Sequence, residues 1–182
     1  NAARFSAVPG ASDLNFGFSR AVWWIKLTLV STAPAPRRVL LEIDYPSLDT
    51  VDFCAGEGEA AVHYRAGDNL PFATRPYVHR NLVFPLDLGP DVPQTIYLRI
   101  AAKGSLTVPL RLWTEASLHR HDEVLYSLHA LYFGMLLALG LYNLLVYLAL
   151  RDGVYLAYVG YLSGMALALL GMLGLGHQFL WP

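Results

Sequence analysis

The stretch VLYSLHALYFGMLLALGLYNLLVYLAL, residues 124–150, decides the fold of this chain, because its 27 residues include no Asp, Glu, Lys or Arg. A helix rises about 1.5 Å per residue, so about 20 apolar residues cross a hydrocarbon core of roughly 30 Å. The stretch is too long for a β-strand and unusually long for a buried helix of a soluble protein. It therefore predicts a transmembrane helix, and its excess length predicts that the helix tilts or projects from the membrane as far as His129.

A second apolar segment, residues 154–175, follows after only Arg151, Asp152 and Gly153. A turn this short permits only an antiparallel helical hairpin. Residues 1–123 and residues 176–182 are therefore expected on the same side of the membrane.

Small and polar residues mark the packing faces of the two spans. Gly160, Gly164 and Ala168 recur every four residues and form a smooth ridge that another helix can approach closely. This ridge packs either within one helix bundle or between the two copies of a homodimer. Asn143 is a strongly polar side chain deep in the first span. We expect it either to bond to another helix or to belong to an element that switches.

The charges divide the chain into two parts that meet different solvents. Residues 1–123 carry 12 of the 13 Lys and Arg and 13 of the 14 Asp and Glu. A soluble segment of about 120 residues is one domain with a core of its own. The net charge of −1 and the absence of basic runs give no indication of nucleic-acid binding. The single cysteine, Cys54, excludes an internal disulfide framework and a Cys-clustered metal site.

The pattern of residues 1–114 predicts an all-β antiparallel sandwich. From Ala21 on, apolar side chains alternate with a second, more polar set, as in a half-buried strand. Residues 1–20 lead into the domain as a loop with room for one short strand. Turn residues separate seven further segments that we predict to be strands, namely 21–30, 39–45, 48–54, 61–64, 77–85, 95–101 and 106–114. Pro109 confines the last of these to an edge or a bulge, because proline cannot donate to a ladder.

Residues 115–123 form a polar collar between the sandwich and the first span. Thr114 or Ser117 can cap a helix that begins here and runs on into the membrane. Such a connection would transmit a motion of the sandwich to the helix. The expected division of the chain is a sandwich at 1–114, a collar at 115–123, spans at 124–150 and 154–175, a turn at 151–153 and a tail at 176–182.

The segment FATRPYVHR, residues 72–80, concentrates side chains suited to ligand binding. On an extended strand Tyr77 and His79 share a face with Arg75, whereas Arg80 points the other way. Arginine presents a planar fork to carboxylates, and tyrosine offers a flat surface on which a sugar can stack. The alternative is that one or both arginines pair with Asp44 or Asp49 and brace the fold.

Other polar and aromatic residues predict bracing or binding. Arg99 lies in an apolar strand, where a charge facing the core must be paired, and Asp44 is the expected partner. Trp23 and Trp24 point to opposite faces of their strand, so at most one lies in the core, and Trp24 is the candidate for sugar stacking. Trp113 is expected to brace the core.

No pattern in the chain indicates catalysis or a cofactor. His119 and His121 are two residues apart, which places them on different sides of a helix and argues against a shared metal. His129 and His177 are expected near the same membrane boundary, where they could meet and bind a proton or a metal, although histidines in such places are usually just solvated. The sequence has no nucleophile motif and no phosphate-binding loop. We therefore predict no catalytic residue, no metal site and no cofactor in this segment.

Several blocks of the chain resemble one family of bacterial receptors, in the family's order and spacing. These blocks are LNFGFSRAVWWIKLTL, LEIDYPSLDTVDF, AGDNLPFATRPYVHRNLVFPLDL, TIYLRIAAKGSLTVPLRLW and YFGMLLALGLYNLLVYLALRDGVYLAYVGY. They resemble the seven-transmembrane receptors with diverse intracellular signalling modules, and residues 1–114 are similar to the type 2 extracellular domain of that family. Arg75, Pro76 and Arg80 match positions that are typical of it.

The resemblance implies a jelly-roll sandwich related to carbohydrate-binding modules, in the periplasm of a bacterium, and a multi-pass protein of the inner membrane. It also implies an output domain beyond this segment, typically a histidine kinase or a diguanylate cyclase. The function expected is extracytoplasmic sensing of a carbohydrate or a small carboxylate. The alternative is a membrane-anchored module that binds a protein, the cell wall or its own twin and has no small-molecule ligand.

Overall fold

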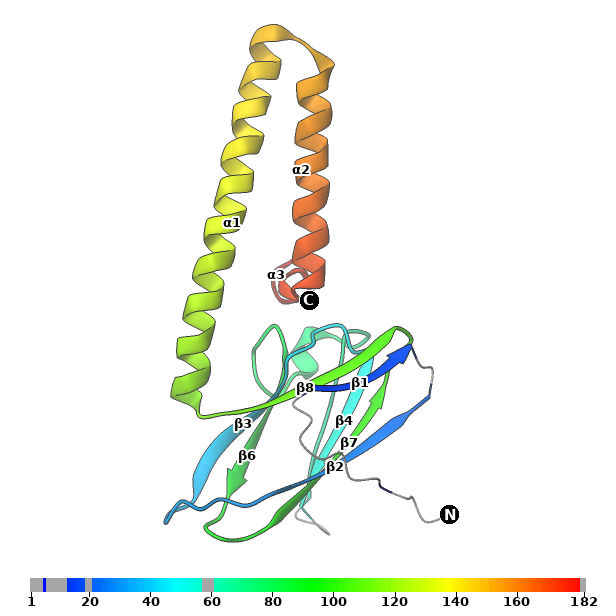
Figure 1. Cartoon of the computed structure of the whole chain (residues 1–182), viewed down its shortest axis with the longest axis vertical. Coiled ribbons are helices and arrows are strands. Elements are labelled where there is room, and N and C mark those ends of the chain that lie inside the picture. The colour runs from blue at the N-terminus through cyan, green and yellow to red at the C-terminus, as the bar shows by residue number, and fades with distance from the viewer. Residues whose placement is uncertain (1–4, 6–12, 19–20, 57–60, 181–182) are drawn as a thin grey trace.

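A two-sheet sandwich stands at the open end of a helical hairpin (Figure 1). This computed structural model describes residues 5, 13–18, 21–56 and 61–180. The predicted antiparallel sandwich, followed by an α-helical hairpin, is confirmed. Its strands among these residues are β1 (Asp13–Phe18), β2 (Trp23–Leu29), β3 (Arg37–Ile43), β4 (Thr50–Ala55), β5 (Val62–Ala66), β6 (Leu82–Leu88), β7 (Gln94–Ala101) and β8 (Ser105–Trp113).

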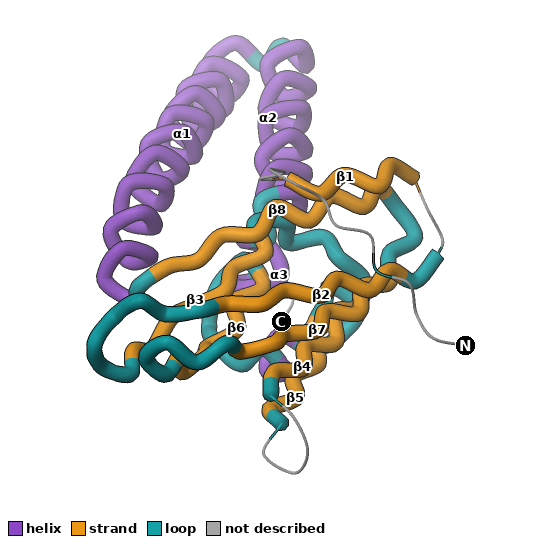
Figure 2. The backbone as a smooth tube through the Cα atoms, turned by 60° about the horizontal axis from the view of Figure 1, so that its bottom comes forward, coloured by secondary structure: helices purple, strands orange, loops and turns teal. Residues whose placement is uncertain are grey.

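The strands form two antiparallel sheets, β1-β8-β3-β6 and β2-β7-β4-β5, which Figure 2 shows as two layers. Alternate side chains of each strand point into the space between the layers. On β7, for example, Ile96, Leu98 and Ile100 are completely buried. Phe53 of the second sheet stacks on Phe84 of the first, with ring centroids 4.7 Å apart. The period-two pattern of the sequence thus builds the core.

One predicted strand begins too early. Residues 77–81 contain bends and no strand, and β6 starts only at Leu82 and runs through Leu88, three residues beyond the predicted end. The bends exist because the side chain of Arg75 binds the backbone carbonyls of residues 79–81. Carbonyls held in this way are not available to a sheet ladder.

Pro109 lies inside β8, which has a neighbour on each side, so the expectation of an edge or a bulge is wrong. β8 pairs with β1 up to Pro109 and with β3 from Leu110 onward. The proline therefore stands where the partner strand changes. Its carbonyl accepts a hydrogen bond from the backbone N–H of Asp44 at 2.9 Å.

The predicted collar and first span form one continuous helix, α1 (Glu115–Leu150). Thr114 and Ser117 both act at its start, because each side chain accepts the backbone N–H of the other, at 3.3 and 2.9 Å. After Arg151 and Asp152 the chain returns as α2 (Gly153–Met172), and a short α3 (Leu175–Phe179) follows. Both α1 and α2 are long and apolar enough to cross a membrane.

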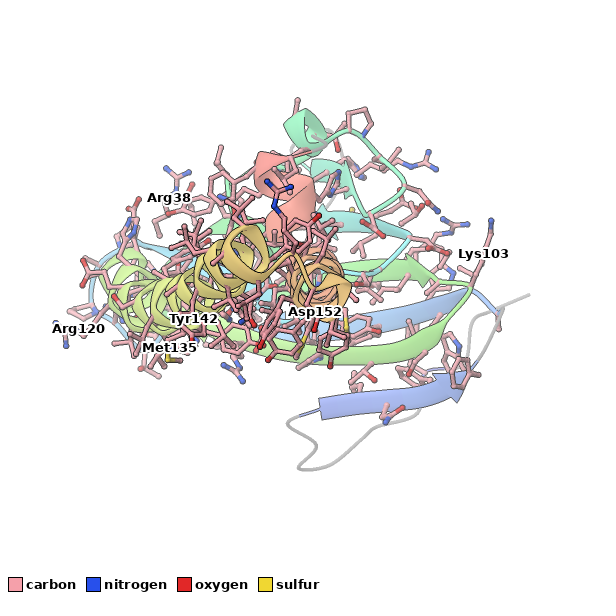
Figure 3. The ribbon with its side chains drawn as sticks, turned by 90° about the horizontal axis from the view of Figure 1, so that it is seen from above. Arg38, Lys103, Arg120, Met135, Tyr142 and Asp152 are labelled. Carbon is pink, nitrogen blue, oxygen red and sulfur yellow. The ribbon has the colours of Figure 1, made fainter. Side chains whose placement is uncertain are left out.

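Among the residues that it describes, the structure shows no hydrogen bond from Asn143 to α2 and no close packing at Gly160 or Gly164. Asn143 donates its side-chain amide to the carbonyl of Leu139 in its own helix, at 2.8 Å. Gly160 and Gly164 are exposed, and a Cβ atom at either would meet nothing within 4 Å. Figure 3 looks along the hairpin and shows Met135 and Tyr142 projecting from α1. Close packing at Gly160 and Gly164, and a bond from Asn143 to another helix, therefore stay predictions.

Candidate functional site: the joint between sandwich and hairpin

The loop of residues 71–81, which we call the joint loop, is shaped by Arg75. This side chain is buried, and its Nη1 donates to the carbonyls of His79, Arg80 and Asn81 at 2.8, 2.6 and 3.3 Å. The ring of Phe72 lies 4.8 Å from the guanidinium carbon. Arg75 therefore braces the fold through backbone carbonyls, and the alternative of a pair with Asp44 or Asp49 is wrong for it.

Arg75 also connects the sandwich to the end of the hairpin. Its Nη2 lies 3.1 Å from Nδ1 of His177 on α3, and a guanidinium can only donate. His177 therefore accepts as a neutral imidazole. Burial lowers the pKa of His177, and the adjacent charge of Arg75 lowers it further, against opposing contributions from Asp68 and the backbone of Leu70. Burial likewise lowers the pKa of Arg75, which the Asp68 carboxylate partly offsets.

His79 connects the joint loop to α1. Its Nδ1 accepts the backbone N–H of Asn81 at 3.1 Å, so the ring proton lies on Nε2. This Nε2 is 3.1 Å from each carboxylate oxygen of Asp122. His79 is almost fully buried, which shields the contact from water and makes it stronger than a surface pair.

Glu42 of β3 carries a third connection. Glu42 is only 2% exposed. Its two carboxylate oxygens accept hydrogen bonds from the side-chain amide of Asn81 at 2.7 Å and from the indole N–H of Trp113 at 2.6 Å. Trp113 in turn stacks on His121 of α1, with ring centroids 4.9 Å apart. Hydrogen bonds and one aromatic stack thus connect the sheet, the joint loop and the first turns of α1.

Arg80 is 8% exposed, and no hydrogen bond or ion pair joins its guanidinium to another residue that the structure describes. Its charge acts on Tyr126 and His129 of α1. Nδ1 of His129 is buried and has no hydrogen-bond partner among the described residues. Arg80 is therefore placed at the hairpin but is not braced as Arg75 is.

A cavity of about 890 Å³ opens between the joint loop, α1 and α3, and we call it the joint cleft. Two of the four side chains of this loop that the sequence indicated for ligand binding, Tyr77 and His79, line the cleft. Burial raises the pKa of Tyr77, and the carboxylates of Glu115 and Asp122 raise it further. The lining residues are Pro76, Tyr77, Val78, His79, His119, Asp122, Glu123, Tyr126, Ser127, Gln178 and Phe179.

Trp24 lies far from the joint, on the outer face of the second sheet. It is 54% exposed, whereas Trp23 packs against the core and stacks on Phe16, so the two tryptophans do take opposite faces. The strand register aligns Trp24, Arg99, Asp52 and Arg65 in one row across the sheet. A depression of about 400 Å³ lies over this row.

Arg99 pairs with a different carboxylate from the one expected. Its Nη1 lies 2.7 Å from Asp52, which also contacts Arg65 at 3.3 Å. Asp44 instead pairs with Arg111 at 3.1 Å. Register decides the partners, because Asp52 is directly opposite Arg99 on the neighbouring strand.

Sequence reasoning missed Glu42, Asn81, Asp122 and Asp52. The signal for Glu42 was a lone carboxylate inside the apolar run VLLEI, since a buried charge needs partners. Asn81 and Asp122 gave no comparable signal, because their partners are distant in sequence. Within the described part of the chain, no three His, Cys, Asp or Glu side chains are grouped to hold a metal ion.

Two family models match the chain. The model described as 7TMR-DISM extracellular 2 matches residues 1–114, and the model described as 7TM diverse intracellular signalling matches residues 125–182. No curated protein matches the chain.

Proposed function

Because the chain belongs to the 7TMR-DISM family, as an extracellular sensor domain followed by part of the transmembrane region, we propose that it is the sensory front of a bacterial signal-transduction receptor. The sandwich stands in the periplasm, and the hairpin crosses the inner membrane as the first two helices. By family these segments are sensory and membrane-spanning rather than enzymatic, and no output domain is in this chain. The signal passes to an intracellular output domain beyond the hairpin.

The observation that carries this proposal is the joint. Arg75 contacts His177 of α3, His79 contacts Asp122 of α1, and Trp113 stacks on His121 of α1. A change in the joint loop therefore reaches both ends of the hairpin at once. A ligand transmits a signal only if it binds two arrangements of this joint unequally.

Trp24 and its row supply the ligand site of this proposal. An exposed indole beside guanidinium and carboxylate groups offers a stacking surface and hydrogen-bonding partners for a sugar. The two positive charges of Arg99 and Arg65 exceed the one negative charge of Asp52, so the row also suits a small carboxylate. Arg75, Tyr77, His79 and Arg80 then act as relay residues of the joint, and the guanidinium of Arg80 has no hydrogen bond or ion pair with another described residue.

The test uses the whole chain in lipid nanodiscs and a panel of neutral sugars, sugar acids and small carboxylates. We expect one class to bind, to change hydrogen exchange at residues 75–81, and to lose binding in Trp24→Ala. Leu112→Ala, an exposed apolar residue of the other sheet, should bind as the unchanged chain does. No binding across the panel, with homodimers recovered by crosslinking in cells, would favour the protein- or cell-wall-binding alternative.

A further inference from the structure

The joint cleft presents one face of α1 to the joint loop. His119, Asp122, Glu123, Tyr126 and Ser127 follow the spacing of a single helix face. Gln178 and Phe179 of α3 close the cleft from another side. A molecule in this cavity would therefore touch all three elements of the joint.

The charges of the lining are negative. Asp122 and Glu123 contribute two carboxylates, and no Lys or Arg among the described residues lines the cleft. Asp122 shares a single Nε2 proton of His79 between its two oxygens, so acceptor positions remain. The Glu123 carboxylate is exposed and forms no ion pair with a residue that the structure describes. Burial raises the pKa of Tyr77 most, the carboxylates of Glu115 and Asp122 raise it further, and the charge of Arg38 opposes them.

Aromatic rings complete the lining. Tyr77 comes from the joint loop, Tyr126 from α1, and Phe179, whose ring is largely exposed, from α3. Aromatic faces attract organic cations, and carboxylates strengthen that attraction. The His and acidic side chains of the cleft are not grouped to hold a metal ion, as far as the described residues go, so the chemistry favours a larger and softer cation.

We propose that the joint cleft binds an organic cation, with its ammonium or quaternary ammonium group between the carboxylates of α1 and the aromatic rings of the joint loop and α3. This goes beyond the proposed function, because the outer-face row of Trp24 plays no part in it. A bound cation bridges the sandwich to both ends of the hairpin and biases the joint toward the arrangement that forms the cleft.

The test measures binding by calorimetry to the whole chain in phosphatidylglycerol nanodiscs, which contain no choline headgroups. The probes are choline, tetramethylammonium and n-butylamine, and 3,3-dimethyl-1-butanol is the uncharged isostere of choline. We expect at least one cation to bind and the alcohol not to bind. Failure of all three cations, or equal binding of choline and the alcohol, would overturn the proposal, as would binding of Zn²⁺ without binding of any of the three.

Two variants locate the site. Glu123→Gln removes an exposed charge without changing shape and should weaken the cation's binding about fivefold. Phe179→Leu should weaken it about threefold. Asp87→Asn, which alters an exposed carboxylate of β6 outside the cleft, should leave binding unchanged. Unchanged affinity in both cleft variants, with melting temperatures equal to that of the parent chain, would show that the cation binds elsewhere.

Discussion

The sandwich and the hairpin bury their apolar side chains in opposite ways. The sandwich encloses a continuous core between its sheets, whereas α1 has Leu118 and α2 has Leu162 as their buried residues in this chain. The helices therefore depend on lipid or on other helices for their lateral contacts. Between the two parts lies the joint, which combines the polar contacts of Arg75, His79 and Glu42 with a small apolar cluster in which Leu118 of α1 packs with Leu40 and Val83 of the first sheet.

The difference shows where the molecule can change state. A closely packed core resists deformation, and apolar spans are stable in lipid. Single hydrogen bonds contribute only about 1 kcal/mol each, so we expect the joint to rearrange more readily than the sandwich core.

The largest effect is expected in the sandwich core. Phe84→Ala removes a completely buried ring that stacks on Phe53, and it should lower the free energy of unfolding by about 3–5 kcal/mol. Urea unfolding of the whole chain in micelles, followed by tryptophan fluorescence, measures this. Leu112→Ala, at an exposed position, is the control and should cost less than about 0.5 kcal/mol. Equal losses in the two variants would contradict a core that is enclosed by the sheets.

The second-largest effect on the free energy of unfolding is expected at the two buried arginines of the joint loop, which should differ from each other. Arg75→Met leaves three carbonyls and His177 without their donor, so we expect a loss of about 3 kcal/mol. Arg80→Met removes a buried charge that has no bonded partner among the described residues, and it should cost less than about 1 kcal/mol. The same unfolding measurement applies. If Arg80→Met lowered the free energy of unfolding more than Arg75→Met does, Arg80 rather than Arg75 would be the residue that braces the joint loop.

Gly174 should decide whether α3 docks on the sandwich. Its φ is +73°, and a Cβ atom there would lie 2.7 Å from Cβ of Pro46 and 2.9 Å from the carbonyl oxygen of Arg80. Gly174→Ala should weaken docking by about 1–2 kcal/mol and increase hydrogen exchange at residues 75–81. Gly171→Ala is the matched control, since a Cβ there meets nothing within 4 Å. Unchanged exchange in Gly174→Ala would argue against the docked α3.

The smallest effect is a pH dependence of the same docking. The pKa of docked His177 lies below its ordinary value of 6.5, so the undocked state binds the proton more readily. Docking is therefore at full strength above about pH 6.5 and weakens as the pH falls below it, by at most about 1.4 kcal/mol per pH unit for one proton. The protection of the amides of residues 75–81 from hydrogen exchange, expressed relative to their intrinsic exchange rate at pH 5.5 and at pH 7.5, measures this change. In His177→Gln the difference should shrink, and an unaltered difference would assign the effect to another group.

The elements could be predicted from local patterns, whereas most partners could not. Period-two alternation and apolar length show in one short window of sequence, so they predict the antiparallel sandwich and the two long apolar helices that the structure shows. The strand over 77–85 was placed too early because Arg75 overrides local propensity by binding backbone carbonyls. Arg99 was given the wrong partner because the choice between Asp44 and Asp52 depends on strand register.

The sequence alone determined that a β-domain precedes a membrane hairpin, since hydropathy and period are properties of neighbouring residues. It also carried the family resemblance that the two family matches confirm. Only the tertiary structure showed that Arg75, His79 and Glu42 connect the sandwich to α1 and α3, because their partners lie up to about a hundred residues away. The first span thus belongs to one continuous helix that starts at Glu115, and the first turns of that helix are part of the joint.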